Sequence, residues 1–225
     1  KLGHAVRSVK EQMALASDDL DSATALLTAR PLAGDASLAD EVITKGRASW
    51  MTHSDRFLGE LRARVRQRQD HAGDVAYRLE PDLKLGHGGL RDVQSLLWAQ
   101  ESGLSALPED LLELDRCYDT LLGVRVALHL SAGRSGDVLR LEDQGAVSAA
   151  GGWGDDDELM ADIAAAGRTI AWLVDENWGR SVSTDERLPD RAISSGIVLR
   201  NGEIELSDRA DPTTDTTLML QAAVA

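Results

Sequence analysis

One stretch of this sequence organises the rest: Leu79-Glu80-Pro81-Asp82-Leu83-Lys84-Leu85-Gly86-His87-Gly88-Gly89-Leu90-Arg91-Asp92-Val93-Gln94. It places three glycines immediately before a predicted helix. The first backbone N–H groups of a helix have no intrahelical acceptor, and flexible glycine backbone lets an anion approach them. Lys84 and Arg91 bracket the glycines, and two cations beside such a bend suit a phosphate chain. The spacing matches neither the Walker loop nor G-x-G-x-x-G, so a tight turn with a surface ion pair is the alternative.

Helical patterns flank this stretch on both sides. Apolar spacing and start signals predict helices over 5–16, 38–50, 55–71, 90–100, 109–130 and 155–178. Residues 23–29 are apolar and partly β-branched, which predicts a short buried strand, although periodicity alone does not separate it from a helix. Asn201-Gly202 between apolar residues predicts a hairpin with a type I′ turn over 197–206, followed by a terminal helix after Asp211-Pro212. The predicted fold class is mainly α: a helical bundle-like domain with a short strand segment near the N-terminus and a C-terminal β-hairpin.

The composition limits the classes of protein to which the chain can belong. It has 225 residues, of which 43% are hydrophobic and 28% are charged, as in a globular protein. The formal net charge of -14 argues against nonspecific nucleic-acid binding, although it leaves room for a local basic pocket. No run of about 18 apolar residues predicts a membrane span. Cys117 is the single cysteine and can form no internal disulfide, so a cytoplasmic location is expected.

Three polar clusters have both a structural and a functional interpretation. Four arginines crowd one predicted helix: Arg62, Arg64, Arg66 and Arg68. Such a row is most often a solvated face beside acidic neighbours, and the alternative is that some of these arginines line an anion pocket. The acidic run at 155–158 favours a helix start over a metal site. His129 lies on an apolar helix face, which favours a core histidine over a ligand.

The stretch at 79–94 resembles the Pro-Asp-x-Lys-x-x-x-Gly-Gly-Leu-Arg-Asp signature of the PII-protein uridylyltransferase/uridylyl-removing enzyme family, the bifunctional nitrogen-regulation enzymes of bacteria. Further segments are similar to that family: Gly3-His4-Ala5-Val6-Arg7, Ala23-Thr24 through Gly34-Asp35, Arg125 to Leu130 with Arg134, Leu141-x-Asp143-Gln144, and the hairpin. The resemblance therefore covers almost the whole chain.

This resemblance implies a division of the chain into three parts. Residues 1–35 would be the C-terminal part of a polymerase-β-type nucleotidyltransferase domain, residues 36–182 a helical domain, and residues 183–225 a linker and hairpin leading toward a hydrolase domain. In the family, Gly-Ser and Asp-x-Asp carboxylates bind Mg²⁺ and the nucleoside triphosphate, UTP or ATP, and a tyrosine hydroxyl of the PII protein attacks the α-phosphate. Those carboxylates would precede Lys1, so we expect a piece of a longer enzyme that transfers no nucleotide by itself.

The resemblance also implies roles for single residues. Lys84 and Arg91 are expected to contact phosphate or the partner, with Gly88 and Gly89 as the backbone cradle. Asp92 is expected to cap or orient the arginine. PII protein and a nucleoside triphosphate are the expected partners, with no nucleic acid and no membrane. No residue of this chain is expected to be catalytic or to bind the metal.

Other residues near these segments have two interpretations each. His4 and Arg7 either face the nucleotide or are structural. His87 either contacts phosphate or is a loop histidine satisfied by protein partners, and the second is favoured. Asp82 either holds the nearby lysine or closes a turn. Thr28 occupies a position at which the family usually has an acidic residue, so a third carboxylate beside the metals is missing there.

Two other functions stay open on the sequence. The chain could be a helical module without catalytic duty that docks PII. It could also be the helical part of a glutamine-synthetase adenylyltransferase, a family with a related Lys-x-Gly-x-Gly-Gly-Ile-Arg pattern. The match at 141–144 and the hairpin argue against the second alternative.

Overall fold

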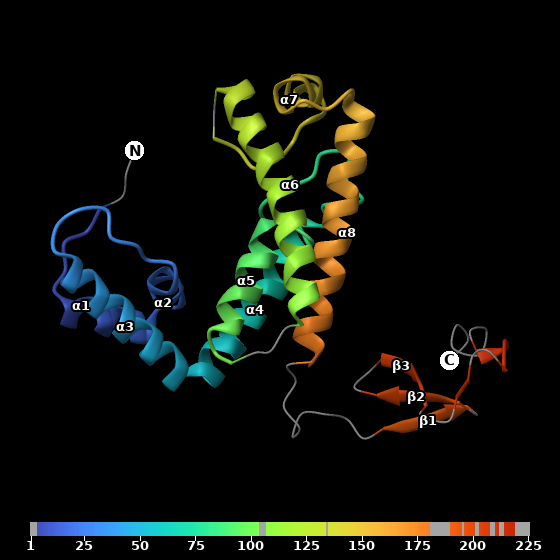
Figure 1. Ribbon diagram of the computed structural model, residues 1–225, viewed down its shortest axis with the longest axis horizontal. Coiled ribbons are helices and arrows are strands. Elements are labelled where there is room, and N and C mark those ends of the chain that lie inside the picture. The colour runs from blue at the N-terminus through green and yellow to red at the C-terminus, as the bar shows by residue number, and fades with distance from the viewer. Residues whose placement is uncertain are drawn as a thin grey trace. The chain divides into compact units, whose positions relative to one another are not determined.

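The computed structural model describes residues 4–103, 107–133, 135–180, 190–194, 196–200, 203–207, 210–211 and 214–218. The chain divides into two compact units, residues 1–179 and 180–225. Helices make up the first unit, and Figure 1 labels them in chain order. They are α1 (Val9–Asp18), α2 (Leu20–Leu27), α3 (Ala36–Thr52), α4 (Ser54–Ala72), α5 (Leu90–Gln100), α6 (Pro108–Ala132), the short 3-10 helix η1 (Leu141–Asp143), α7 (Gln144–Gly151) and α8 (Asp156–Arg180).

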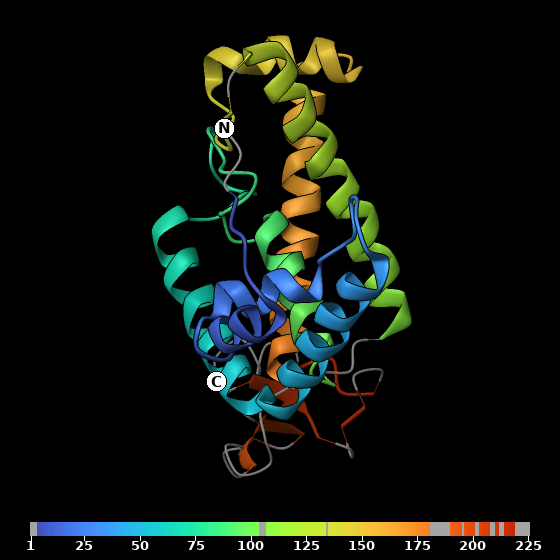
Figure 2. The same ribbon diagram turned by 90° about the vertical axis from the view of Figure 1, so that its left-hand side faces the viewer.

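The first three helices pack against one another (Figure 2). A capping side chain precedes each of them. Ser8 forms a capping box with Glu11, so α1 starts at Val9, later than the predicted start at residue 5. The Asp19 carboxylate accepts the N–H of Ser22 at 2.7 Å at the start of α2. Asp35 caps α3 in the same way.

The predicted strand at 23–29 is wrong, because most of this run lies in α2. The hydroxyl of Thr24 donates to the carbonyl of Leu20 at 3.0 Å, a contact between successive helical turns. Leu20, Leu26 and Leu27 are buried in the core that α2 shares with its neighbours. In the described part of the first unit no β-strand lies beside this run. An aspartate cap and packing between helices therefore decide a run whose periodicity was ambiguous.

Helices α4 to α8 share a continuous hydrophobic core. The fully buried Leu96, Leu121 and Ile170 come from α5, α6 and α8, and burying each side chain contributes about 1.5–3 kcal/mol. α6 and α8 lie side by side in both views, and Asn177 near the end of α8 donates to Asp110 near the start of α6 at 3.3 Å. The helices predicted over 38–50, 55–71, 90–100, 109–130 and 155–178 are confirmed, most of them one or two residues longer at each end.

The second unit contains a three-stranded antiparallel sheet in the order β1 (Arg191–Ser194), β2 (Ile197–Arg200) and β3 (Glu203–Leu206). The predicted hairpin is confirmed as β2 and β3, whose register pairs Arg200 with Glu203. β1 adds a strand that the sequence did not indicate. Asn201-Gly202 and most of the predicted terminal helix lie outside the described residues, so the turn type stays a prediction.

Candidate functional site

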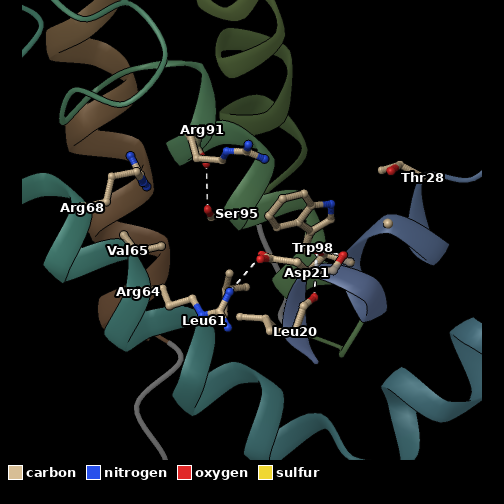
Figure 3. A pocket seen from close by; sticks show the side chains of 12 residues that line it. Leu20, Asp21, Thr28, Leu61, Arg64, Val65, Arg68, Arg91, Ser95 and Trp98 are labelled. Atoms are coloured by element: carbon tan, nitrogen blue, oxygen red, sulfur yellow. Dashed lines mark hydrogen bonds and ion pairs between the residues drawn. The ribbon is translucent and has the colours of Figure 1, made fainter. Parts of the chain in front are cut away.

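A pocket of about 510 Å³ lies between α2, α4 and α5 (Figure 3), and we call it the arginine pocket. Arg64 and Arg68 come from successive turns of α4, and Arg91 comes from the first turn of α5. The other lining residues are Leu20, Asp21, Thr24, Ala25, Thr28, Leu61, Val65, Ser95 and Trp98. The cavity thus gathers three cationic side chains and one carboxylate, Asp21, in a chain with a net charge of -14. This arrangement is the one that an anion pocket on the arginine-rich helix requires.

Arg64 and Arg68 already have carboxylate partners. The Arg64 guanidinium lies 2.9 Å from Asp21 and 2.8 Å from Glu60, and all three side chains are substantially exposed. Arg68 Nη2 donates to Asp92 Oδ1 at 2.6 Å, and Asp92 is completely buried. The charges of these two arginines are therefore largely balanced before any ligand enters.

The partners of Arg91, in contrast, are neutral. Its Nη1 donates to Gln94 Oε1 at 3.1 Å, and its guanidinium carbon lies 5.5 Å from the centre of the Trp98 ring. Positions 91, 94 and 98 share one face of α5 because three, four and seven residues bring a helix back to the same side. Within the described part of the chain no carboxylate pairs with Arg91. An entering anion would thus gain a charged donor without displacing an existing ion pair.

Asp92 connects the glycine-rich loop to α4. Its Oδ1 accepts from Arg68 and, at 3.1 Å, from Gln69 Nε2, while its Oδ2 accepts the backbone N–H of Gly88 at 2.7 Å. The sequence suggested that Asp92 caps or orients Arg91. Its contacts instead hold Arg68, Gln69 and the loop backbone at Gly88.

The backbone N–H groups of the glycine-rich loop donate to acceptors within the protein. The N–H of Gly89 donates to Gly86, that of Leu90 to Leu83, and that of Arg91 to Lys84, at 2.9–3.0 Å. Gly88 has a φ of +80°, and a Cβ there would collide with the carbonyl oxygen of Gly167 on α8. These glycines let the loop approach a neighbouring helix closely. Their role as a phosphate cradle stays a prediction.

Lys84 lies beside a second carboxylate. Its Nζ is 3.5 Å from Asp137 Oδ2, and Arg125 Nε donates to Asp137 Oδ1 at 2.7 Å. Burial raises the pKa of Asp137. The hydrogen bond and charge of Arg125, together with Lys84, lower this pKa by more, so the net shift is downward. Asp82 accepts the N–H groups of Lys84 and Leu85 at 3.0 and 2.8 Å, which is the turn role anticipated for it.

His87 lies between two aspartates. Its Nδ1 is 2.9 Å from Asp74 and its Nε2 is 3.0 Å from Asp175 on α8. The hydrogen bond to Asp175 is the largest cause of a pKa raised to about 9, which burial opposes and Asp74 reinforces. His87 is therefore a cation at neutral pH whose two nitrogens are both engaged, as the satisfied loop histidine favoured by the sequence requires. His129 is half-buried and its Nε2 lies 2.8 Å from the carbonyl oxygen of Gly136.

The remaining candidate residues lie near the N-terminus of the first unit. His4 and Arg7 are exposed before α1, where Arg7 Nη1 donates to Gln12 at 3.2 Å, and neither lines the arginine pocket. Thr28 is the C-cap of α2 and lines the pocket opposite Arg91 (Figure 3). The position at which the resemblance implies an acidic residue therefore lies on the wall of this pocket.

Sequence reasoning missed Gln94 and Trp98 as neighbours of Arg91. Their spacing on a helix that had been predicted correctly was the signal available. Among the described residues no group of three or more His, Cys, Asp or Glu side chains is arranged to hold a metal ion. In the same residues no helix combines the length and apolar character needed to cross a membrane.

A protein-family model described as GlnD PII-uridylyltransferase matches residues 56–176, which are more than half of the chain. The chain belongs to this family. The match spans α4 to α8 and so contains the glycine-rich loop and all three arginines of the pocket.

Curated relatives carry the name bifunctional uridylyltransferase/uridylyl-removing enzyme. The protein of Mycobacterium tuberculosis is 37% identical over the whole chain, and that of Streptomyces coelicolor is 36% identical over the whole chain. The protein of Caulobacter vibrioides is 34% identical over 69% of the chain. The chain spans 30%, 29% and 18% of the lengths of these relatives. No solved structure matches it.

Proposed function

We propose that this chain is the helical part of a PII uridylyltransferase and that its arginine pocket receives phosphate oxygens of the nucleoside triphosphate, UTP or ATP. The observation that carries the proposal is the Arg91 guanidinium, which faces a 510 Å³ pocket with neutral partners. Such a pocket has the size of a small-molecule site. The Arg64 guanidinium lines the same pocket but is paired with Asp21 and Glu60.

In the proposed reaction a tyrosine hydroxyl of PII loses its proton and attacks the α-phosphate, the α–β phosphoanhydride bond breaks, and pyrophosphate leaves. Negative charge develops on the phosphate oxygens during this exchange. A preorganised guanidinium beside these oxygens lowers the barrier electrostatically. Among the lining residues Asp21 is the one carboxylate, and it is paired with Arg64, while Thr28 and Ser95 offer hydroxyls, so this pocket does not fit Mg²⁺ as a ligand set. The proposal therefore assigns the metal and the catalytic carboxylates to residues outside this chain, and assigns Arg91 to phosphate binding and orientation.

The names of the relatives favour a uridylyltransferase over a glutamine-synthetase adenylyltransferase. Among the residues of the original motif, Arg91 is the one whose side chain faces the arginine pocket. Lys84 instead pairs with Asp137, so its proposed role is to hold the glycine-rich loop in place. A cytoplasmic location follows from the proposed partner, PII.

The test is Arg91→Ala in the full-length enzyme, assayed for modification of purified PII with UTP and ATP in parallel. Losing a charge-assisted hydrogen bond should lower kcat/KM about 10- to 100-fold. Arg116→Ala is the matched control, because the Arg116 side chain is 78% exposed on α6 and, among the described residues, its ion pair is with Glu113 one turn away. Unchanged kcat/KM in a folded Arg91→Ala enzyme would remove the arginine pocket from the reaction.

A further inference from the structure

A second cavity of about 900 Å³ adjoins the arginine pocket. Thr28, Arg91 and Trp98 line both spaces, so the two adjoin along α5, and we call them together the groove. The second space, which we call the Trp98 cavity, continues past the C-terminal ends of α2 and α3. Its further lining residues are Leu27, Met51, Gln94, Leu97, Gln100, Glu101 and Gly103.

The two halves of the groove differ in chemistry. The arginine pocket has three cationic side chains, whereas the Trp98 cavity combines apolar side chains with two amides and the Glu101 carboxylate. Met51 and Leu97 on its wall are about half exposed, at 54% and 48%. Large apolar side chains left open beside an aromatic ring suit a flat, weakly polar ligand group.

Gln94 is oriented by its neighbour. Its Oε1 accepts from Arg91 Nη1, which leaves Nε2 as the amide's donor for a further partner. Among the described residues no acceptor is hydrogen-bonded to Gln94 Nε2. An amide donor next to an indole face is a combination that can hold a planar heterocycle by its face and by a carbonyl at its edge.

We propose that the Trp98 cavity binds the nucleobase of the triphosphate, with Trp98 as the stacking surface and Gln94 Nε2 as the donor to a ring carbonyl. This inference rests on the proposed function, because Arg91 stands at the junction and would hold the phosphates on its other side. Trp98 and Gln94 are then specificity residues for the nucleotide, contributed by a helix outside the catalytic carboxylates. The ligand class is a pyrimidine or purine nucleoside triphosphate.

The test compares three ligands on the full-length enzyme by calorimetry: UTP, ATP and inorganic tripolyphosphate, which lacks a base. Trp98→Leu keeps apolar volume against the core but removes the stacking face. It should weaken the better nucleotide about 5- to 100-fold and leave tripolyphosphate unchanged, because stacking on an aromatic ring contributes to base binding alone. Trp98→Phe, which keeps an aromatic face, should recover most of the affinity.

The outcomes separate the inference from the proposed function. Arg91→Ala should weaken all three ligands, and if it weakens none the proposed function fails. If Arg91→Ala weakens all three but Trp98→Leu changes neither nucleotide, the arginine pocket stands and the base site is overturned. Equal weakening of nucleotide and tripolyphosphate by Trp98→Leu also overturns it, since Trp98 would then act only by positioning Arg91. If Trp98→Leu does not fold, the same comparison is made with Gln94→Ala, which leaves the core intact.

Discussion

At the scale of single residues, the partner of an arginine decides its use in this protein. Arg68 forms an ion pair with Asp92, a carboxylate with no exposure to solvent. This pair holds the first turn of α5 against α4. Arg64 forms ion pairs with two exposed carboxylates, and water competes with both of these pairs. Arg91 has neutral partners and is the arginine of the pocket best suited to bind an anion. The row of arginines in the sequence thus contains side chains of different function.

This difference predicts unequal costs of truncation. Arg68→Ala leaves the Asp92 carboxylate buried without its cation, so we expect unfolding to become easier by about 3–5 kcal/mol. Arg64→Ala removes exposed pairs, which contribute about 0–1 kcal/mol. Urea denaturation of the two variants beside the unaltered chain measures both values. Equal destabilisation would contradict the assignment of Arg68 to the fold.

At the scale of elements, the glycine-rich loop acts as a joint between helices. Asp92 fixes it to α4, and His87 fixes it to α8 through Asp175. Gly88 allows the loop backbone to meet the backbone of Gly167, which is far along the chain. The start of α5, and with it Arg91, is therefore positioned by contacts to the helices on either side.

The His87 link predicts a pH dependence. The folded pKa of about 9 lies above the ordinary value of 6.5, so protonation stabilises the folded chain. The contribution is complete below pH 6.5 and is lost as the pH rises through about 9. We expect the Tm of the unaltered chain to fall across this window more steeply than that of His87→Gln, which carries no titrating group at this position. Parallel curves of Tm against pH for the two proteins would show that the contacts of His87 with Asp74 and Asp175 do not stabilise the fold.

The sequence predicted those elements whose signals are local. The helix at 90–100 follows a glycine bend and has a clear apolar face, and its limits agree with α5. The run at 23–29 failed because its apolar residues fit either structure, and packing against α1 and α3 decided it. For the candidate site the sequence singled out Arg91. It did not reveal that Lys84 pairs with Asp137 and Arg68 with Asp92, because these partners lie in distant segments. The cavity beside Trp98 depends on the ends of α2 and α3, whose placement no local pattern reveals.

At the scale of the whole molecule, the role proposed for this chain is to supply one wall of a site whose catalytic carboxylates lie elsewhere. It spans 30% of the length of its M. tuberculosis relative. Its Asp19-Leu20-Asp21 sequence has the spacing of a metal-binding carboxylate pair but no preceding Gly-Ser. The structure commits Asp19 to the cap of α2 and Asp21 to Arg64. Binding and transfer should therefore be separable in this chain.

We expect the chain of 225 residues to bind a triphosphate weakly and to modify no PII. With Arg91 as the main charged contact that lacks a carboxylate partner, a dissociation constant of about 0.1–1 mM is expected, since one good ionic contact and a partial stacking surface supply about 4–5.5 kcal/mol. NMR titration with UTP should shift the indole N–H signal of Trp98, and Arg91→Ala should abolish the shift. Incubation with PII, Mg²⁺ and radiolabelled UTP should leave PII unlabelled, while the full-length enzyme labels it in parallel. Labelling by the chain alone would place catalytic carboxylates within these residues and contradict the proposed separation of binding from transfer. An unperturbed Trp98 signal would show that the nucleotide does not bind in the groove.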